Sequence, residues 1–242
     1  MGSAMTDRVV DVGTVGPITG ISSMAMRQVL AELADAYAQR SGQPVTVVSA
    51  GGVDAARRVG EGEAFDFVVL AADAIDRLAA GGRVDPGSRV DLARSAIAMA
   101  VAAGTTRPDV SCEAAIREAV LDARSIGYST GPSGAHLLRL FERWGIAEAL
   151  APRIVQASPG TPVASLVANG DVELGFQQLS ELMHASGVDV IGVLPAEIQA
   201  ATVFSAAICT ASNHPESARA LLAFLASPQA AAAKRRHGME PA

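Results

Sequence analysis

The sequence predicts an α/β protein of two lobes with a ligand cleft between them. Short apolar runs rich in β-branched residues alternate with longer stretches of helical periodicity, which is typical of βαβ units and mostly parallel sheets. Half of the 242 residues are hydrophobic, enough for one large or two small cores. Two long apolar runs, 95–103 and 202–209, divide the chain into thirds, as two strands that cross between lobes would.

Residues 1–100 and 203–242 are predicted to form the first lobe, in two separate pieces. This arrangement suits a domain whose chain termini lie close together. In the first piece we expect strands at 9–15, 44–49 and 65–70, and helices at 22–41, 53–60 and 73–80. Helical stretches at 215–226 and 228–238 complete the lobe after the second crossing strand.

Residues 101–202 are predicted to form the second lobe. Helices are expected at 112–121, 133–144, 162–169 and 179–184, and strands at 125–129, 153–157, 174–176 and 188–193. Two crossing strands make a hinge, and the cleft between two lobes is the usual place for a ligand.

The charge and hydropathy of the chain indicate which partners and which cellular compartment to expect. The formal net charge is −6, whereas nucleic-acid binders usually carry a basic face, so we expect no nucleic-acid partner. The chain contains no uncharged apolar run of 18 or more residues, so we expect no membrane-spanning helix. Thr6-Asp7-Arg8 leads from Met5 into the first expected strand, and neither a basic n-region nor an apolar h-region precedes that strand. We therefore expect a cytoplasmic protein, or alternatively a periplasmic protein whose signal peptide has been removed. We also expect a monomer.

Four strand-to-helix junctions carry the residues of an anion site. They cover 16–23, 49–52, 129–134 and 158–162, and each is rich in glycine and hydroxyl residues. The first N–H groups of a helix have no internal partner, and together with the helix dipole they bind anions. Any one junction is better explained as an ordinary cap or turn. Four of them, two from each lobe, favour a shared anion site at the carboxyl ends of the strands.

Three side chains outside the glycine-rich loops are further candidates. Gln177 and Gln178 end a strand with two amides, which either bind a carboxylate or hydroxyl of the ligand or form a solvated loop. His136 lies in the first turns of a helix, where the positive helix end disfavours the imidazolium. It is the candidate general base, and the alternative is a side chain that packs on the sheet.

Signatures of cofactors, metals and hydrolases are not found in the sequence. The chain has no G-x-x-x-x-G-K-[ST] loop, no G-x-G-x-x-G, no H-E-x-x-H and no G-x-S-x-G. We therefore expect neither a cofactor nor a metal. The four junctions lead us to expect a small anionic substrate or ligand as the partner.

With these loops placed, the sequence resembles the molybdate-binding-protein-like family of type 2 periplasmic solute-binding proteins. The resemblance covers nearly the whole chain and rests on GGVDAARRVGEGEAFDFVVLAADAIDRLAAGGRV (51–84), GYSTGPSGAHLLRLFERWGI (127–146), VASLVANGDVELGFQQLSEL (163–182) and LLAFLASPQAAAAKRRHGMEP (221–241). It implies the two-lobed type 2 fold, with the anion held by hydroxyls and backbone N–H groups. The ligand-facing residues that these loops and the resemblance together indicate are Thr19, Ser22, Ser23, Ser49, Gly51, Ala72, Ser129, Thr130, Ser133, Gly134, Thr161, Val163, Gln177 and Gln178.

Two departures from the molybdate binders bear on the ligand. Gln177-Gln178 stands where those proteins present a Tyr, and the first loop reads Gly-Pro-Ile-Thr-Gly. The GFQQ-SEL and YS-SG-H patterns are instead similar to the aconitate isomerase branch, which implies an allylic proton shift on a di- or tricarboxylate. Two alternatives stay open. One is a non-catalytic receptor for molybdate or another small anion, with an ABC permease as its partner, and the other is a cytoplasmic ligand-sensing module.

Overall fold

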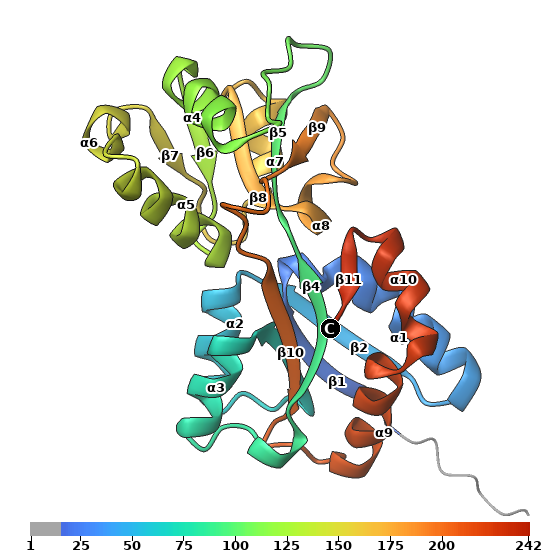
Figure 1. The fold of residues 1–242 in the computed structure, drawn as a ribbon. Helices are drawn as coiled ribbons and strands as arrows, with labels where there is room; N and C mark the ends of the chain where they lie inside the picture. The colour runs from blue at the N-terminus through green and yellow to red at the C-terminus, as the bar shows by residue number, and fades with distance from the viewer. Residues whose placement is uncertain (1–15) are drawn as a thin grey trace, which may run out of the picture.

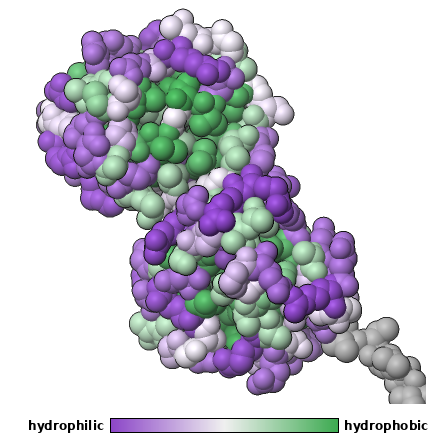
Figure 2. All heavy atoms as spheres, turned by 45° about the vertical axis from the view of Figure 1, so that its right-hand side comes forward, coloured by the Kyte–Doolittle hydropathy of each residue, from purple (hydrophilic) through white to green (hydrophobic). Residues whose placement is uncertain are grey.

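The computed structural model describes residues 16–242, and the strand expected at 9–15 lies outside them. The chain forms two lobes, each built on its own sheet with helices on both faces (Figure 1). The predicted α/β fold class with two lobes is confirmed. Seen as spheres, the lobes are two rounded masses joined at a narrower waist (Figure 2).

The first lobe contains a six-stranded sheet in the order β11-β4-β10-β3-β1-β2. The strands β1, β2 and β3 are parallel, whereas β10 and β11 are antiparallel to their neighbours. Its strands are β1 (Ile18–Ser23), β2 (Val45–Ala50), β3 (Phe67–Ala71), β4 (Val90–Ser95), β10 (Thr202–Ile208) and β11 (Met239–Pro241). Its helices are η1 (Met24–Met26), α1 (Arg27–Ser41), α2 (Gly52–Gly60), α3 (Ala72–Ala80), η2 (Pro86–Ser88), α9 (Pro215–Ala226), η3 (Pro228–Ala230) and α10 (Ala231–Arg236).

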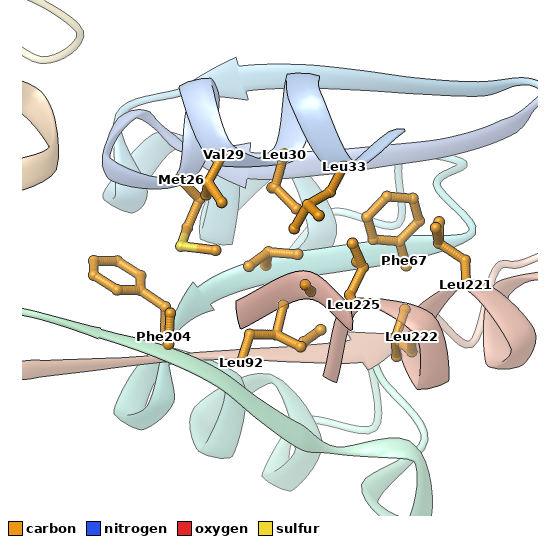
Figure 3. Packing of buried hydrophobic residues seen from close by; sticks show 14 of the residues in the cluster. Met26, Val29, Leu30, Leu33, Phe67, Leu92, Phe204, Leu221, Leu222 and Leu225 are labelled. Carbon is orange, nitrogen blue, oxygen red and sulfur yellow. The ribbon is translucent and has the colours of Figure 1, made fainter. Parts of the chain in front are cut away.

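Helices cover both faces of this sheet, so its central strands are buried on both sides. On one face, α1 and α9 pack their leucines against Phe67, Leu92 and Phe204 of the sheet (Figure 3). On the other face, α2 and α3 pack against Ile21 and Leu70. This double cover explains why β3 is apolar at every position.

The first strand differs from the sequence expectation. We predicted a loop at 16–23, but ITGISS forms β1, which pairs with β2 on one side and β3 on the other. A Cβ at Gly20 would lie 2.3 Å from the ring of Phe67, so glycine here makes room for that ring rather than marking a turn. The first helix consequently begins at Arg27, after the single turn η1.

The second lobe contains a five-stranded sheet in the order β7-β6-β8-β5-β9. The strands β6, β7 and β8 are parallel, and β5 runs antiparallel to β8 and β9. Its strands are β5 (Ile97–Ala102), β6 (Ile126–Tyr128), β7 (Ile154–Gln156), β8 (Leu174–Gln178) and β9 (Val188–Val193). Its helices are α4 (Glu113–Asp122), α5 (Pro132–Arg143), α6 (Ala147–Leu150), α7 (Val163–Ala168) and α8 (Leu179–Leu182).

The chain crosses between the sheets twice. The apolar run at 95–103 is not one strand, because β4 ends at Ser95 in the first sheet and β5 begins at Ile97 in the second. This change of sheet lies a few residues before the predicted boundary at residue 100. The return crossing is the segment between β9 and β10. Gln199 ties the two crossings together, since its side chain bonds the backbone N–H and C=O of Ile97 and the carbonyl of Leu194.

Candidate active site in the cleft between the lobes

A cavity of about 630 Å³ lies between the two lobes. Its size is within the range usual for small-molecule sites. The first lobe contributes the end of β1 and the starts of α2 and α3, and the second lobe contributes the starts of α5, α7 and α8. The segment 200–204, which is the end of the return crossing and the start of β10, completes the wall.

Three helices of nine residues or more begin at this cavity without a side-chain cap. They are α2, α3 and α5, and their N-cap residues are Gly51, Ala71 and Gly131. Serine or aspartate at such a position would stabilise the helix by about 1 kcal/mol, because the side chain accepts a hydrogen bond from a free N–H group. The protein supplies no such acceptor here, so the N–H groups and the positive dipole ends are available to a ligand anion from both lobes.

Two buried polar atoms at the cavity have no hydrogen-bond partner among the described residues. They are Ser23 Oγ and Gln178 Oε1. The amide nitrogen of Gln178 donates to Thr202 Oγ1 at 2.7 Å. Because a hydroxyl can either donate or accept, the amide can turn over and present either its oxygen or its NH2 group to the cavity. Unpaired buried polar atoms are rare in native proteins, so these two are available to bind a ligand.

Ten of the fifteen residues predicted from the sequence line this cavity. They are Ser23, Gly51, Ala72, Ser129, Thr130, Ser133, His136, Thr161, Gln177 and Gln178. Four junctions from two lobes therefore meet, as the sequence analysis expected. Gln177 and Gln178 belong to the strand β8 itself and are buried, which excludes the alternative of a solvated loop.

Thr19 is the clearest departure from the predicted site. It lies near the start of β1, whereas the cavity lies beyond the end of that strand at Ser23. Its N–H and hydroxyl bond the carboxylate of Asp66, at 2.8 and 3.1 Å. The error follows from reading β1 as a loop, because a strand of six residues separates its two ends by roughly 17 Å.

Four other predicted residues support the site without lining the cavity. Ser22 and Ser49 are opposite each other in the parallel pair of β1 and β2, with their hydroxyls 3.2 Å apart. The N–H of Val163 donates to Gln177 Oε1 at 2.9 Å. Gly134 allows α5 to approach the preceding loop, since a Cβ there would lie 1.8 Å from the carbonyl oxygen of Ser129.

His136 is half-buried on α5 and faces the cavity. Its Nε2 lies 2.8 Å from the carbonyl oxygen of Ile198, in the return crossing. A carbonyl oxygen only accepts, so Nε2 carries the proton in this bond. The neutral ring then has its lone pair on Nδ1, which is the form that a general base requires.

Sequence reasoning missed the four charged residues of the cavity, which are Asp73, Arg77, Arg139 and Glu181. Glu181 on α8 accepts a hydrogen bond from Gln177 Nε2 at 2.7 Å, and burial raises the pKa of its carboxyl to about 7. Arg139 lies three residues after His136 on the same helix, and within residues 16–242 no carboxylate pairs with it. The spacing i, i+3 from His136 on α5 is a signal in the sequence that points to Arg139. No such helical spacing points to Glu181, because Gln177 belongs to the strand β8.

Neither a metal cluster nor a spanning helix is found in the part of the chain that the structure describes. No group of three or more His, Cys, Asp or Glu side chains there could hold a metal ion. No helix there is both long and apolar enough to cross a membrane.

Comparison with known proteins places this cleft among ligand-binding proteins of one architecture. The chain is 38% identical over 233 residues to an aconitate isomerase from Pseudomonas sp., which covers 94% of this chain and 88% of the relative. The periplasmic molybdate-binding protein of Azotobacter vinelandii superposes with a TM-score of 0.77 at 21% identity, over 92% of this chain and 98% of that protein. The sulfate-binding protein SubI of Mycobacterium tuberculosis H37Rv superposes with a TM-score of 0.74 at 18% identity, over 93% and 86%.

These likenesses confirm the resemblance found in the sequence and the type 2 periplasmic-binding-protein fold. The profile of a family described as "Bacterial extracellular solute-binding protein" matches residues 18–240. That description favours the periplasmic alternative and gives no support to the cytoplasmic expectation. The match spans nearly the whole chain and includes both lobes and the cleft between them. The chain therefore belongs to the family of bacterial extracellular solute-binding proteins.

Proposed function

We propose that this protein binds a small di- or tricarboxylate between its lobes and isomerises it by an allylic proton shift, as an aconitate isomerase. The observation that supports binding is the meeting of three uncapped helix N-termini from both lobes at one cavity. The observation that supports isomerisation is the 38% identity to an aconitate isomerase over nearly the whole chain.

The carboxylates of the substrate would be held mainly by neutral donors. The N–H groups at the starts of α2, α3 and α5 lie at the wall of the cavity, together with the hydroxyls of Ser23, Ser129 and Thr130. Arg139 adds a cation at the same wall. Ligands with several carboxylates suit this arrangement, because the helix ends approach the cavity from separate directions.

The reaction needs a proton to leave one carbon and another to join a second carbon. A base removes a proton from the methylene carbon of the acid, and the electron pair forms a new double bond to the neighbouring carbon. The old double bond opens, and its far carbon takes up a proton. His136 is the leading base, since its Nε2 is held by Ile198 and its Nδ1 is unprotonated in the neutral ring.

Incubation with trans-aconitate tests this proposal directly. We expect cis-aconitate to accumulate in proton NMR spectra, and His136→Ala to lower the rate by about 100-fold or more. Thermal shifts with carboxylates, molybdate and sulfate, measured in parallel, report binding independently of turnover. Absence of turnover together with a shift specific to molybdate would support the receptor for an ABC importer instead. A fully active His136→Ala variant would show that another residue is the base.

A further inference from the structure

Glu181 is a carboxyl group that the binding of an anion does not explain. It lies on α8 at the wall of the main cavity and also borders a second cavity of about 420 Å³ beside it. An anion site lined by helix N-termini gains nothing from a carboxylate, which would repel the ligand. The residue therefore calls for a different role in the cleft.

A chain of two hydrogen bonds fixes the position of the Glu181 carboxyl. The N–H of Val163 can only donate, so it sets the oxygen of the Gln177 amide toward itself, at 2.9 Å. The NH2 group of Gln177 then points to Glu181 Oε1, at 2.7 Å. Only one carboxyl oxygen is engaged in this way, and the other oxygen is left to carry a proton or to face the cavity.

The surroundings of Glu181 favour its neutral form. Burial raises its pKa to about 7, although the hydrogen bond from Gln177 acts in the opposite direction. No cation among residues 16–242 forms an ion pair with it. The charged and titratable groups that face the two cavities around it are Arg27, Asp73, Arg77, His136, Arg139 and His184. Asp73 and Arg77 pair with each other, at 2.8 Å. Burial has the largest effect on the pKa of Glu181, larger than that of the hydrogen bond from Gln177.

We propose that Glu181 is a second catalytic residue, the acid that delivers a proton to the vinylic carbon while His136 removes one from the methylene carbon. This inference rests on the proposed function. One C–H bond breaks at the methylene carbon, one C–H bond forms at the vinylic carbon, and the double bond moves between them. Afterwards Glu181 is a carboxylate and His136 an imidazolium, and proton exchange with water restores both. In the reverse direction the two residues exchange roles.

The isosteric variant Glu181→Gln tests this assignment, because glutamine keeps the acceptor for Gln177 but has no acidic proton. We expect its rate of aconitate isomerisation to fall by at least about 100-fold. Its Kd for the saturated analogue propane-1,2,3-tricarboxylate, measured by calorimetry, should stay within about threefold of wild type. Glu142→Gln, a substitution at an exposed position of α5 outside the cavity, is the matched control and should retain the wild-type rate.

Proton uptake on binding provides a readout that does not depend on turnover. When a carboxylate ligand enters the cleft at pH 8, Glu181 should take up a proton, and the heat of binding should vary with the ionisation enthalpy of the buffer. The Glu181→Gln variant should lose this dependence. An active wild type with an equally active Glu181→Gln variant would overturn the role of Glu181 alone. A wild type that binds carboxylates but never converts aconitate would overturn the proposed function, and the catalytic role with it.

Discussion

Two inward-facing carboxyl groups in this molecule are held in opposite ways. Asp66, at the far end of the first lobe, accepts hydrogen bonds from the N–H of Thr19, the hydroxyl of Ser212 and the N–H of His214. Burial alone would raise its pKa, but these donors together hold the pKa below its ordinary value. Glu181, in the cleft, has a single amide donor, and burial raises its pKa to about 7.

The two ends also differ in the partners of their backbone N–H groups. At the far end, the carboxylate of Asp66 accepts the N–H groups of Asn213 and His214, just before α9 begins. At the cleft, α2, α3 and α5 begin at Gly51, Ala71 and Gly131 with no side-chain acceptor. Asp66 thus binds the backbone N–H groups of the turn before α9, although α9 itself also begins without a side-chain cap. The starts of α2, α3 and α5 differ in that they lie at the wall of the cavity.

Removing the charge at the far end should have the largest effect on stability. In Asp66→Asn, an NH2 group replaces one acceptor and faces buried N–H donors, so we expect a loss of about 3 kcal/mol in the free energy of unfolding. Urea denaturation measures this loss, and ligand affinity of the folded variant should not change. Asp122→Asn, at the exposed end of α4, is the control and should lie within about 0.5 kcal/mol of wild type. Equal losses of unfolding free energy in both variants would show that the hydrogen bonds of Asp66 do not stabilise the fold.

The two carboxyls should also respond to pH with opposite signs. The lowered pKa of Asp66 stabilises the fold above the ordinary value of about 3.9, and this contribution is lost as pH falls through the lowered pKa. The raised pKa of Glu181 means that the folded state binds the extra proton. Its contribution is complete below about pH 4.3 and is lost as pH rises through about 7.

We therefore expect Glu181→Gln to become more stable relative to wild type as pH rises. The difference in the free energy of unfolding should grow by about 3 kcal/mol between pH 4 and pH 8, because the wild type alone must bury an ionised group. Urea denaturation at a series of pH values measures it. A difference that stays constant over this range would show that the half-buried carboxyl of Glu181 is not neutral at pH 4 to 7.

The elements β1 and α8 show which features of the structure could be predicted from the sequence and which could not. Alternation of apolar and helical segments predicted the two-lobed fold, because that pattern is local and strong. The segment ITGISS misled, since its glycine and hydroxyls are typical of a loop. Its place between β2 and β3 depends on long-range pairing, and the need for Gly20 depends on the ring of Phe67. The placement of Thr19 failed with it.

The site residues likewise divide into those indicated by local sequence and those placed by long-range packing. Most of the hydroxyl and glycine residues proposed in the later loops lie at the cavity, because strand ends in a parallel sheet meet at one edge. Glu181 could not be recognised, since an acidic residue on a short helix is normally exposed. Its partial burial comes from the packing of α8 against η1 of the other lobe and against α7, which no local pattern encodes.

Two neighbouring serines on β1 allow the finest test of the difference between stability and binding. Ser22 Oγ bonds Ser49 and does not line the cavity, whereas Ser23 Oγ lines it and has no partner among the described residues. We expect Ser22→Ala to lower the free energy of unfolding by about 1 kcal/mol and to leave ligand affinity unchanged. Ser23→Ala should leave stability within about 0.5 kcal/mol and weaken tricarboxylate binding by about tenfold. Urea denaturation measures the free energy of unfolding of both variants, and calorimetry measures their affinity for the tricarboxylate. If both variants lost only stability, or both lost only ligand affinity, Ser22 and Ser23 would not have the separate roles proposed here.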